Sequence, residues 1–333
     1  MNYKDISKSR SCIMGFAMIM IIIFHTDIQY HHLLDIIKNY GDFGVNLFFA
    51  ISGFSMCYAW KKEADTKKFL KNRFLRIGIT YFPISIVWCF LTYLMHESTF
   101  VEMICKILTI QFWLDGNLLQ WFVSAILVFY LFTPIWMIGY DKNKKINIII
   151  SLAISIVCLF LPIFVSGLFK YSLFFQRVPS YILGLFLGKI TIEEKEYTVF
   201  SKLSFFSTLF IAVVLLIIID FSPFNFKYKY IIYMFLTYPV LMMLSFIFSK
   251  LKESNWLVKF FIFMGGITLE IYLLHEKILK IANIIKGKLP IIFDQRNIII
   301  NILVIAITIC IAFLYHKIDD YFYKKIRFGK NLQ

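Results

Sequence analysis

The chain has 333 residues, of which 60% are hydrophobic and only 17% are charged, and its formal net charge is +15. The apolar residues fall in blocks of about 18 to 22 residues, each long enough to cross a hydrocarbon core of about 30 Å as a helix. So many blocks in so short a chain exclude an ordinary soluble fold. The lysines and arginines lie mainly between the blocks, so the charge points to membrane topology and not to a nucleic-acid partner.

Ten apolar blocks follow one another, and we expect each to form a transmembrane helix of an all-α bundle. They cover residues 11–28, 41–60, 77–95, 118–138, 147–166, 172–190, 203–219, 230–249, 260–282 and 298–316. The first block follows a basic segment, but no small-x-small cleavage site comes after it. We therefore expect it to stay as the first helix and not to be removed as a signal peptide. Because no linker or repeat divides the chain, we expect one integral membrane domain over residues 1–333.

The loop charges predict the orientation of the bundle. Alternate gaps differ more than twofold in their content of lysine and arginine, and the richer set includes both ends of the chain. The positive-inside rule then favours a cytoplasmic N-terminus and a cytoplasmic C-terminus. The six cysteines lie within or beside apolar blocks and form no C-x-x-C pair, so we interpret them as small buried hydrophobic residues and expect no metal site.

Polar residues inside apolar blocks are costly in a bilayer, so each is a candidate functional residue. His25 ends the run Ile-Met-Ile-Ile-Ile-Phe-His, about 22 Å along the first helix if that helix starts near Arg10. A neutral imidazole at this depth can act as a base or accept an acyl group. The alternative is an interfacial histidine next to Asp27.

The second block opens with Gly41-Asp-Phe-Gly44-Val-Asn-Leu-Phe48-Phe-Ala-Ile-Ser52-Gly-Phe54. Gly41, Gly44 and Phe48 share one helical face. Small residues on one face let another helix backbone approach closely, and this packing role accounts for the glycines. Ser52 is a candidate site residue, although serines in membrane helices often bond only to their own backbone.

Two arginines, Arg73 and Arg76, come just before the third block and share a face if that segment is helical. Two guanidinium groups on one face suit a phosphate or pyrophosphate. The alternative is ordinary positive-inside charge.

The sixth and ninth blocks carry Arg177, Glu270 and His275. Pro179 follows Arg177 closely and predicts a broken or kinked helix there. A buried arginine needs a partner or an aqueous cavity, and Glu270 could meet that need in a purely structural salt bridge. Glu270 and His275 are five residues apart and therefore point about 140° apart on a helix.

Together these residues resemble the acyltransferase 3 family, membrane O-acyltransferases that modify cell-surface glycans, over essentially the whole chain. The stretch from Gly41 to Phe54 is similar to the family's G-x-x-G-V-x-x-F-F-x-x-S-G-F, and His25 to the histidine that ends its first helix. The family's R-F-x-R, fourth-helix tryptophan, R-x-P and Y-x-x-H elements are matched in order by Arg73 and Arg76, Trp121, Arg177 and Pro179, and Tyr272 and His275.

The resemblance implies transfer of an acyl group, acetyl first among the candidates, from cytoplasmic acyl-CoA to a hydroxyl of a cell-surface or lipid-linked glycan. It implies a multi-pass protein of a bacterial inner or plasma membrane, in contact with lipid and without a metal. The residues it implies are His25, Ser52, Arg177, Glu270 and His275 for catalysis, Arg73, Arg76 and Arg10 for acyl-CoA, and Trp121 and Tyr272 for the substrate.

One position departs from the family pattern. The family usually has an arginine eleven residues before the first-helix histidine, and here that residue is Met14. Arg10 lies about one turn lower and could supply the charge from the same face.

Two other functions fit the same features. A transporter of a glycan or small solute also combines about ten helices with buried charge and broken helices, although no inverted repeat is visible. A membrane receptor or assembly factor without enzymatic activity is the third possibility. The sequence leaves open the acceptor, the length of the acyl group and the oligomeric state.

Overall fold

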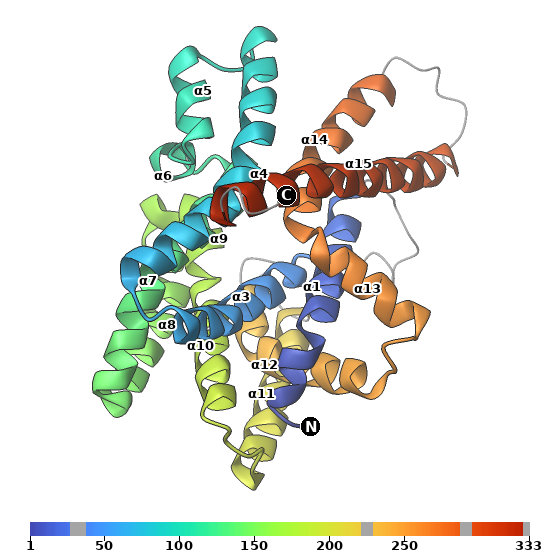
Figure 1. Cartoon of the computed structure of the whole chain (residues 1–333). Coiled ribbons are helices and arrows are strands. Elements are labelled where there is room, and N and C mark those ends of the chain that lie inside the picture. The colour runs from blue at the N-terminus through green and yellow to red at the C-terminus, as the bar shows by residue number, and fades with distance from the viewer. Residues whose placement is uncertain (27–37, 221–228, 287–294, 329–333) are drawn as a thin grey trace.

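The computed structural model describes residues 1–26, 38–220, 229–286 and 295–328, and within these ranges the chain is helical and has no strand. Figure 1 shows the helices in one bundle. They are α1 (Lys4–His25), α3 (Phe43–Lys62), α4 (Thr66–Leu94), α5 (Phe100–Ile107), α6 (Gln111–Asp115), η1 (Leu118–Gln120), α7 (Trp121–Lys142), α8 (Lys144–Phe164), η2 (Ser166–Tyr171), α9 (Ser172–Phe175), α10 (Val178–Ile192), α11 (Val199–Asp220), α12 (Lys229–Lys250), α13 (Trp256–Gly266), α14 (Thr268–Lys286) and α15 (Gln295–Phe328).

The number of spans differs from the expected ten. In the described ranges, eight helices are long and apolar enough to cross a membrane, and α13 with α14 makes a ninth if the pair counts as one span. The sixth expected span, 172–190, is divided at Gln176 and Arg177, which leaves α10 with only 15 residues. The break that Pro179 predicts is therefore present. The ninth expected span bends by 75° between α13 and α14.

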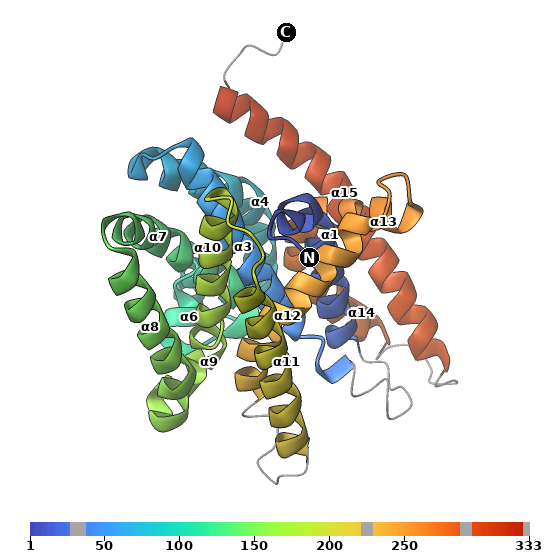
Figure 2. The ribbon, with the colours of Figure 1, turned by 90° about the horizontal axis from the view of Figure 1, so that it is seen from below.

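The centre of the bundle is the pair α3 and α10. Figure 2 shows these two helices side by side, with α7 and α8 on one side and α1, α13 and α15 on the other. A Cβ atom at Gly53 would overlap the carbonyl oxygen of Tyr181, and one at Gly184 would overlap that of Ala50. The two backbones thus lie in direct contact.

The first and second spans meet in the same way. A Cβ atom at Gly44 would overlap the carbonyl oxygen of Ala17, and one at Gly41 would lie 2.6 Å from that of Met20. The packing role predicted for the glycines is confirmed. It fixes the end of α1, and hence His25, against the start of α3.

The helices differ in how much of their surface the bundle covers. Of the most apolar 18-residue window of each helix, 78% is buried in α3, but only 17% in α11 and 22% in α15. Helices at the periphery therefore present apolar side chains outward, as expected of a protein surrounded by lipid.

Candidate functional site

The starts of three helices meet at Asp42. This aspartate precedes α3, Arg177 precedes α10, and Lys229 is the first residue of α12. The Asp42 carboxylate lies 2.9 Å from the Lys229 ammonium and 3.8 Å from Nη2 of Arg177. The hydroxyl of Tyr233 donates a hydrogen bond to the same carboxylate. One buried carboxylate therefore holds two buried cations at the end of the bundle where α1 ends.

Arg177 is among the most buried side chains, with 1% of its surface exposed. Its guanidinium carbon lies 4.8 Å from the centre of the Tyr230 ring and 5.8 Å from that of Tyr233, which is cation–π distance. The prediction that a buried Arg177 needs a partner is confirmed. The structural alternative, a salt bridge with Glu270, is wrong because Asp42 occupies that place and Glu270 pairs elsewhere.

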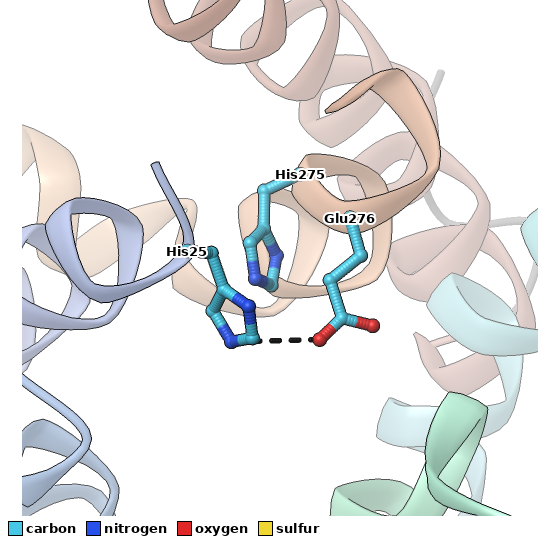
Figure 3. A group of neighbouring side chains, drawn as sticks. All are labelled: His25, His275 and Glu276. Carbon is cyan, nitrogen blue, oxygen red and sulfur yellow. Dashed lines mark ion pairs between the residues drawn. The ribbon is translucent and has the colours of Figure 1, made fainter. Parts of the chain in front are cut away.

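His25 is the last residue of α1 and meets α14 (Figure 3). Its Nε2 lies 3.5 Å from Oε1 of Glu276, and its ring centre lies 4.9 Å from that of His275. The two rings are set edge to face at 67°. About a third of the His25 side chain is exposed, and it lines an open cavity of about 510 Å³ together with Glu276 and residues of the next two turns of α14. Asp27, the neighbour expected in the alternative interpretation, lies outside the described residues.

The hydrogen bonds of His275 define its tautomer. Its Nδ1 lies 2.7 Å from the carbonyl oxygen of Tyr272 and 3.2 Å from that of Ile271. Because carbonyl oxygens only accept hydrogen bonds, Nδ1 carries the proton. Nε2 of His275 is buried and has no partner among the described residues. In a neutral ring this nitrogen offers its lone pair beside His25.

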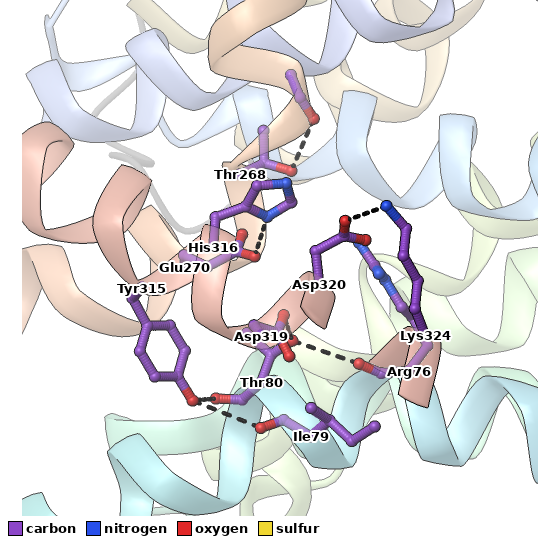
Figure 4. Close-up of polar contacts among 11 residues, drawn as sticks. Arg76, Ile79, Thr80, Thr268, Glu270, Tyr315, His316, Asp319, Asp320 and Lys324 are labelled. Atoms are coloured by element: carbon purple, nitrogen blue, oxygen red, sulfur yellow. Dashed lines mark hydrogen bonds and ion pairs between the residues drawn. The ribbon is translucent and has the colours of Figure 1, made fainter. Parts of the chain in front are cut away.

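Glu270 belongs to a different group of side chains. Its Oε1 lies 2.6 Å from Nδ1 of His316 on α15 (Figure 4). The carboxylate is 2% exposed. Glu270 and His275 are five positions apart and point in different directions on α14, as the helical angle predicts, so Glu270 does not join the His25 group.

Comparison with known proteins decides the family. A family description named "Acyltransferase domain" matches residues 12–317, which is most of the chain and includes the groups around Asp42, His25 and Glu270. The chain belongs to the acyltransferase 3 family. No curated protein and no solved structure matches it significantly.

The arginine pair that the acyltransferase 3 resemblance assigns to acyl-CoA lies within α4, so the two side chains do share a helical face. Both side chains are half-buried. Arg76 stacks 5.0 Å from the ring centre of Tyr323, near the end of α15. Nε of Arg73 is buried without a partner in the described part of the chain. Neither arginine lines the cavity at His25.

The aromatic residues matched to the acyltransferase 3 pattern line up toward His275. The ring of Tyr272 lies 5.5 Å from that of His275 and 4.6 Å from that of Phe122, and Phe122 lies 6.2 Å from Trp121. Trp121 is buried. A continuous aromatic contact thus leads from the start of α7 to the histidine pair.

The matched Ser52, and Arg10, which was expected to stand in for the family's missing arginine, lie apart from this group. Ser52 is half-buried in the middle of α3, ten residues after Asp42. Arg10 is exposed, and about 22 Å of helix separate it from His25 along α1. Met14, at the position of the family's usual arginine, is partly buried and packs against the core.

Among the charged and imidazole side chains of these contacts, four were not singled out from the sequence: Asp42, Lys229, Glu276 and His316. The first two flank helix starts, where charged residues look like ordinary loop residues. Glu276 follows His275 directly, and it becomes a candidate only because its partner, His25, lies on another helix, α1. No spacing rule along α14 could have found it, because successive residues point about 100° apart and only the position of α1 brings both side chains to His25.

Proposed function

We propose that the protein transfers an acyl group, in the first instance acetyl, from cytoplasmic acyl-CoA to a hydroxyl of a cell-surface or lipid-linked glycan. The observation that carries this proposal is the placement of His25 at an open cavity, beside Glu276 and His275, whose Nε2 has no partner among the described residues. An imidazole held by a carboxylate is the usual arrangement of a general base for acyl transfer. Family membership supports the reaction class.

His25 begins the reaction in this scheme. Glu276 faces its Nε2 and stabilises a proton there, so the other ring nitrogen takes the proton of the acceptor hydroxyl. The hydroxyl oxygen attacks the thioester carbonyl, the carbon–sulfur bond breaks, and the thiolate of CoA leaves with the proton from the imidazole. In the alternative order the imidazole first carries the acyl group and then passes it to the hydroxyl.

The positive charge at the same end of the bundle assists the transfer. Arg177 and Lys229 share one carboxylate, Asp42, so this group of three carries a net positive charge. Positive charge fixed in a low-dielectric site stabilises the negative charge that develops on the attacked carbonyl oxygen. Glu270 does not reach this site and acts on it through the position of α14.

The donor enters from the other end of the bundle. The arginine pair of α4, Arg73 and Arg76, holds the phosphates of acyl-CoA, and Ser52 lines the path of the pantetheine arm. With the N-terminus in the cytoplasm, the arginines face the compartment that contains acyl-CoA, and His25 lies nearer the outer surface of a bacterial inner or plasma membrane. Arg10 adds charge on the cytoplasmic side, and Trp121 and Tyr272 form an aromatic wall for the acceptor.

One assay tests the proposal. Purified protein in detergent is given radiolabelled acetyl-CoA with and without candidate acceptors, and the release of CoA is measured. We expect release that is lost in His25→Ala while the protein stays folded, because loss of a general base costs about 10²- to 10⁴-fold. A transporter would bind or move solute without releasing CoA, and an active His25→Ala protein would refute the assignment of His25.

A further inference from the structure

A second cluster of ionisable side chains lies where α4, α14 and α15 meet. Glu270 comes from the first turn of α14, and His316 and Asp319 come from one face of α15, three residues apart. Figure 4 shows these side chains converging on one region, with Thr80 of α4 beside them. This cluster is separate from His25, Glu276 and His275.

Three side chains that can bind a metal ion lie close together in the cluster. Nδ1 of His316 lies 2.6 Å from Glu270, and the hydroxyl of Thr80 donates a 2.6 Å hydrogen bond to Oδ2 of Asp319. One donor atom from each of Glu270, His316 and Asp319 lies within 4.8 Å of the other two.

The cluster has too little positive charge of its own. Glu270 is 2% exposed and Asp319 is 3% exposed, so both carboxylates are removed from water. His316 can balance one of them at most. Neither forms an ion pair with a lysine or arginine in the part of the chain that the structure describes. Burying the remaining carboxylate without a countercharge costs several kcal/mol.

A second observation points to a ligand. Oδ1 of Asp319 is buried and has no hydrogen-bond partner among the described residues. Thr80 satisfies the other oxygen of the same carboxylate. Asp319 also borders an apolar groove of about 600 Å³ between α4 and α15. The cluster therefore has one carboxylate oxygen that no described residue satisfies and that an ion could use.

We propose that Glu270, His316 and Asp319 bind one divalent transition-metal ion, zinc or manganese. One imidazole and two carboxylates are ligands that both ions accept, whereas magnesium and calcium prefer oxygen alone. The ion takes the place of the proton that His316 and Glu270 share, so binding releases a proton and neutralises the buried charge. The absence of a metal motif along the chain is no objection, because the ligands come from two helices 46 residues apart in sequence.

The site ties three helices together. The hydroxyl of Tyr315 donates to the carbonyl oxygens of Thr80, at 3.1 Å, and Ile79, at 3.4 Å, which holds α15 on α4 beside the cluster. Glu270 adds α14, the helix that carries His275 and Glu276. The metal thus has a positioning role, and the reacting atoms lie elsewhere.

The test compares two neighbouring aspartates of α15. Asp319→Asn removes the unpartnered oxygen of a buried carboxylate, whereas Asp320→Asn removes an exposed carboxylate that pairs with Lys324. The full chain is purified in detergent without chelators, and zinc and manganese per chain are measured by inductively coupled plasma mass spectrometry. We expect about one ion per chain in the wild type and in Asp320→Asn, and at least about a tenfold loss in Asp319→Asn.

A second measurement keeps the proposal falsifiable if Asp319→Asn folds poorly. Wild-type protein is stripped with EDTA, and its melting temperature is measured with added zinc chloride or manganese chloride. A metal that binds only the folded state raises this temperature. The proposal is overturned if the wild type holds neither ion and neither ion raises the melting temperature, or if Asp319→Asn keeps the ion.

The outcome is independent of the proposed function. Release of CoA is measured on the same preparations, and its dependence on His25 reports on the acyltransferase site alone. A metal-free protein with His25-dependent release would refute the metal site and leave the proposed function in place. A metal-loaded protein whose CoA release does not depend on His25 would support the metal site and refute the role proposed for His25.

Discussion

The imidazole of His25 and the carboxylate of Glu276 face each other between α1 and α14, with Nε2 and Oε1 3.5 Å apart. Glu276→Gln keeps the size of the side chain but removes the charge that stabilises a proton on His25. We expect the rate of His25-dependent CoA release to fall about 10- to 100-fold with little change in the KM for acyl-CoA. Glu194→Gln removes an exposed glutamate that pairs with Lys4, away from the cavity, and serves as the matched control. An unchanged rate in Glu276→Gln would remove Glu276 from the mechanism.

The arginine pair of α4 predicts a different kinetic effect. Arg73→Ala with Arg76→Ala should raise the KM for acyl-CoA at least about tenfold, because each guanidinium–phosphate pair adds a charge-assisted hydrogen bond. The maximal rate should change little, since neither arginine lines the cavity at His25. Lys71→Ala, which removes an exposed cation of the same helix, controls for loss of general positive charge. A fall in the maximal rate at unchanged KM would contradict the donor-binding role.

Removing the charge of Asp42 should lower the stability of the protein, because two buried cations depend on it. Asp42→Asn leaves Arg177 and Lys229 buried without their carboxylate, which we expect to cost about 3–5 kcal/mol in the free energy of unfolding. Asp141→Asn breaks the more exposed pair with Lys189 and should cost less than about 1 kcal/mol. Chemical denaturation in detergent, followed by tryptophan fluorescence, gives both values. Equal losses of unfolding free energy in the two variants would show that the buried ion pairs of Asp42 stabilise the protein no more than the exposed pair of Asp141.

Two adjacent glycines at the end of α13 predict opposite outcomes. A Cβ atom at Gly265 would overlap the carbonyl oxygen of Ser11 on α1, whereas nothing lies within 4 Å of one at Gly266. Gly265→Ala should therefore destabilise the protein by about 1–3 kcal/mol, because a helix backbone cannot yield as a side chain can. Gly266→Ala should have little effect. The melting temperatures of the two variants measure the difference, and similar values would mean that α1 and α13 do not pack this closely.

The sequence predicts the helices well because the apolar blocks are long and continuous. Every expected span overlaps a helix of the structure, and the close contacts of Gly41 and Gly44 follow from their spacing on one face. The count of spans is less accurate, because hydropathy does not register the breaks at Gln176–Arg177 and at Ile267. Both breaks lie inside apolar sequence, where composition stays the same on either side.

The partners of the buried charges were less predictable than the charges themselves. The sequence shows that Arg177 lies in an apolar block, where burying its charge is costly. Its partner Asp42, however, is 135 residues away in sequence and lies at a helix start. Glu270 similarly pairs with His316, 46 residues further on, and not with Arg177. Spacing along one helix predicts which residues share a face. It does not predict which other helix that face meets, and this is why the second cluster was not expected.

The length of α15 has a consequence for how the protein sits in its membrane. Its 34 residues extend about 51 Å, well beyond a hydrocarbon layer of about 30 Å, so the helix must tilt or project from the bilayer. The same helix contacts α14 through His316 and α4 through Asp319. A thicker or thinner bilayer that changes the tilt of α15 therefore changes the distances in both contacts at once. The length of the lipid chains thus affects the spacing between these helices.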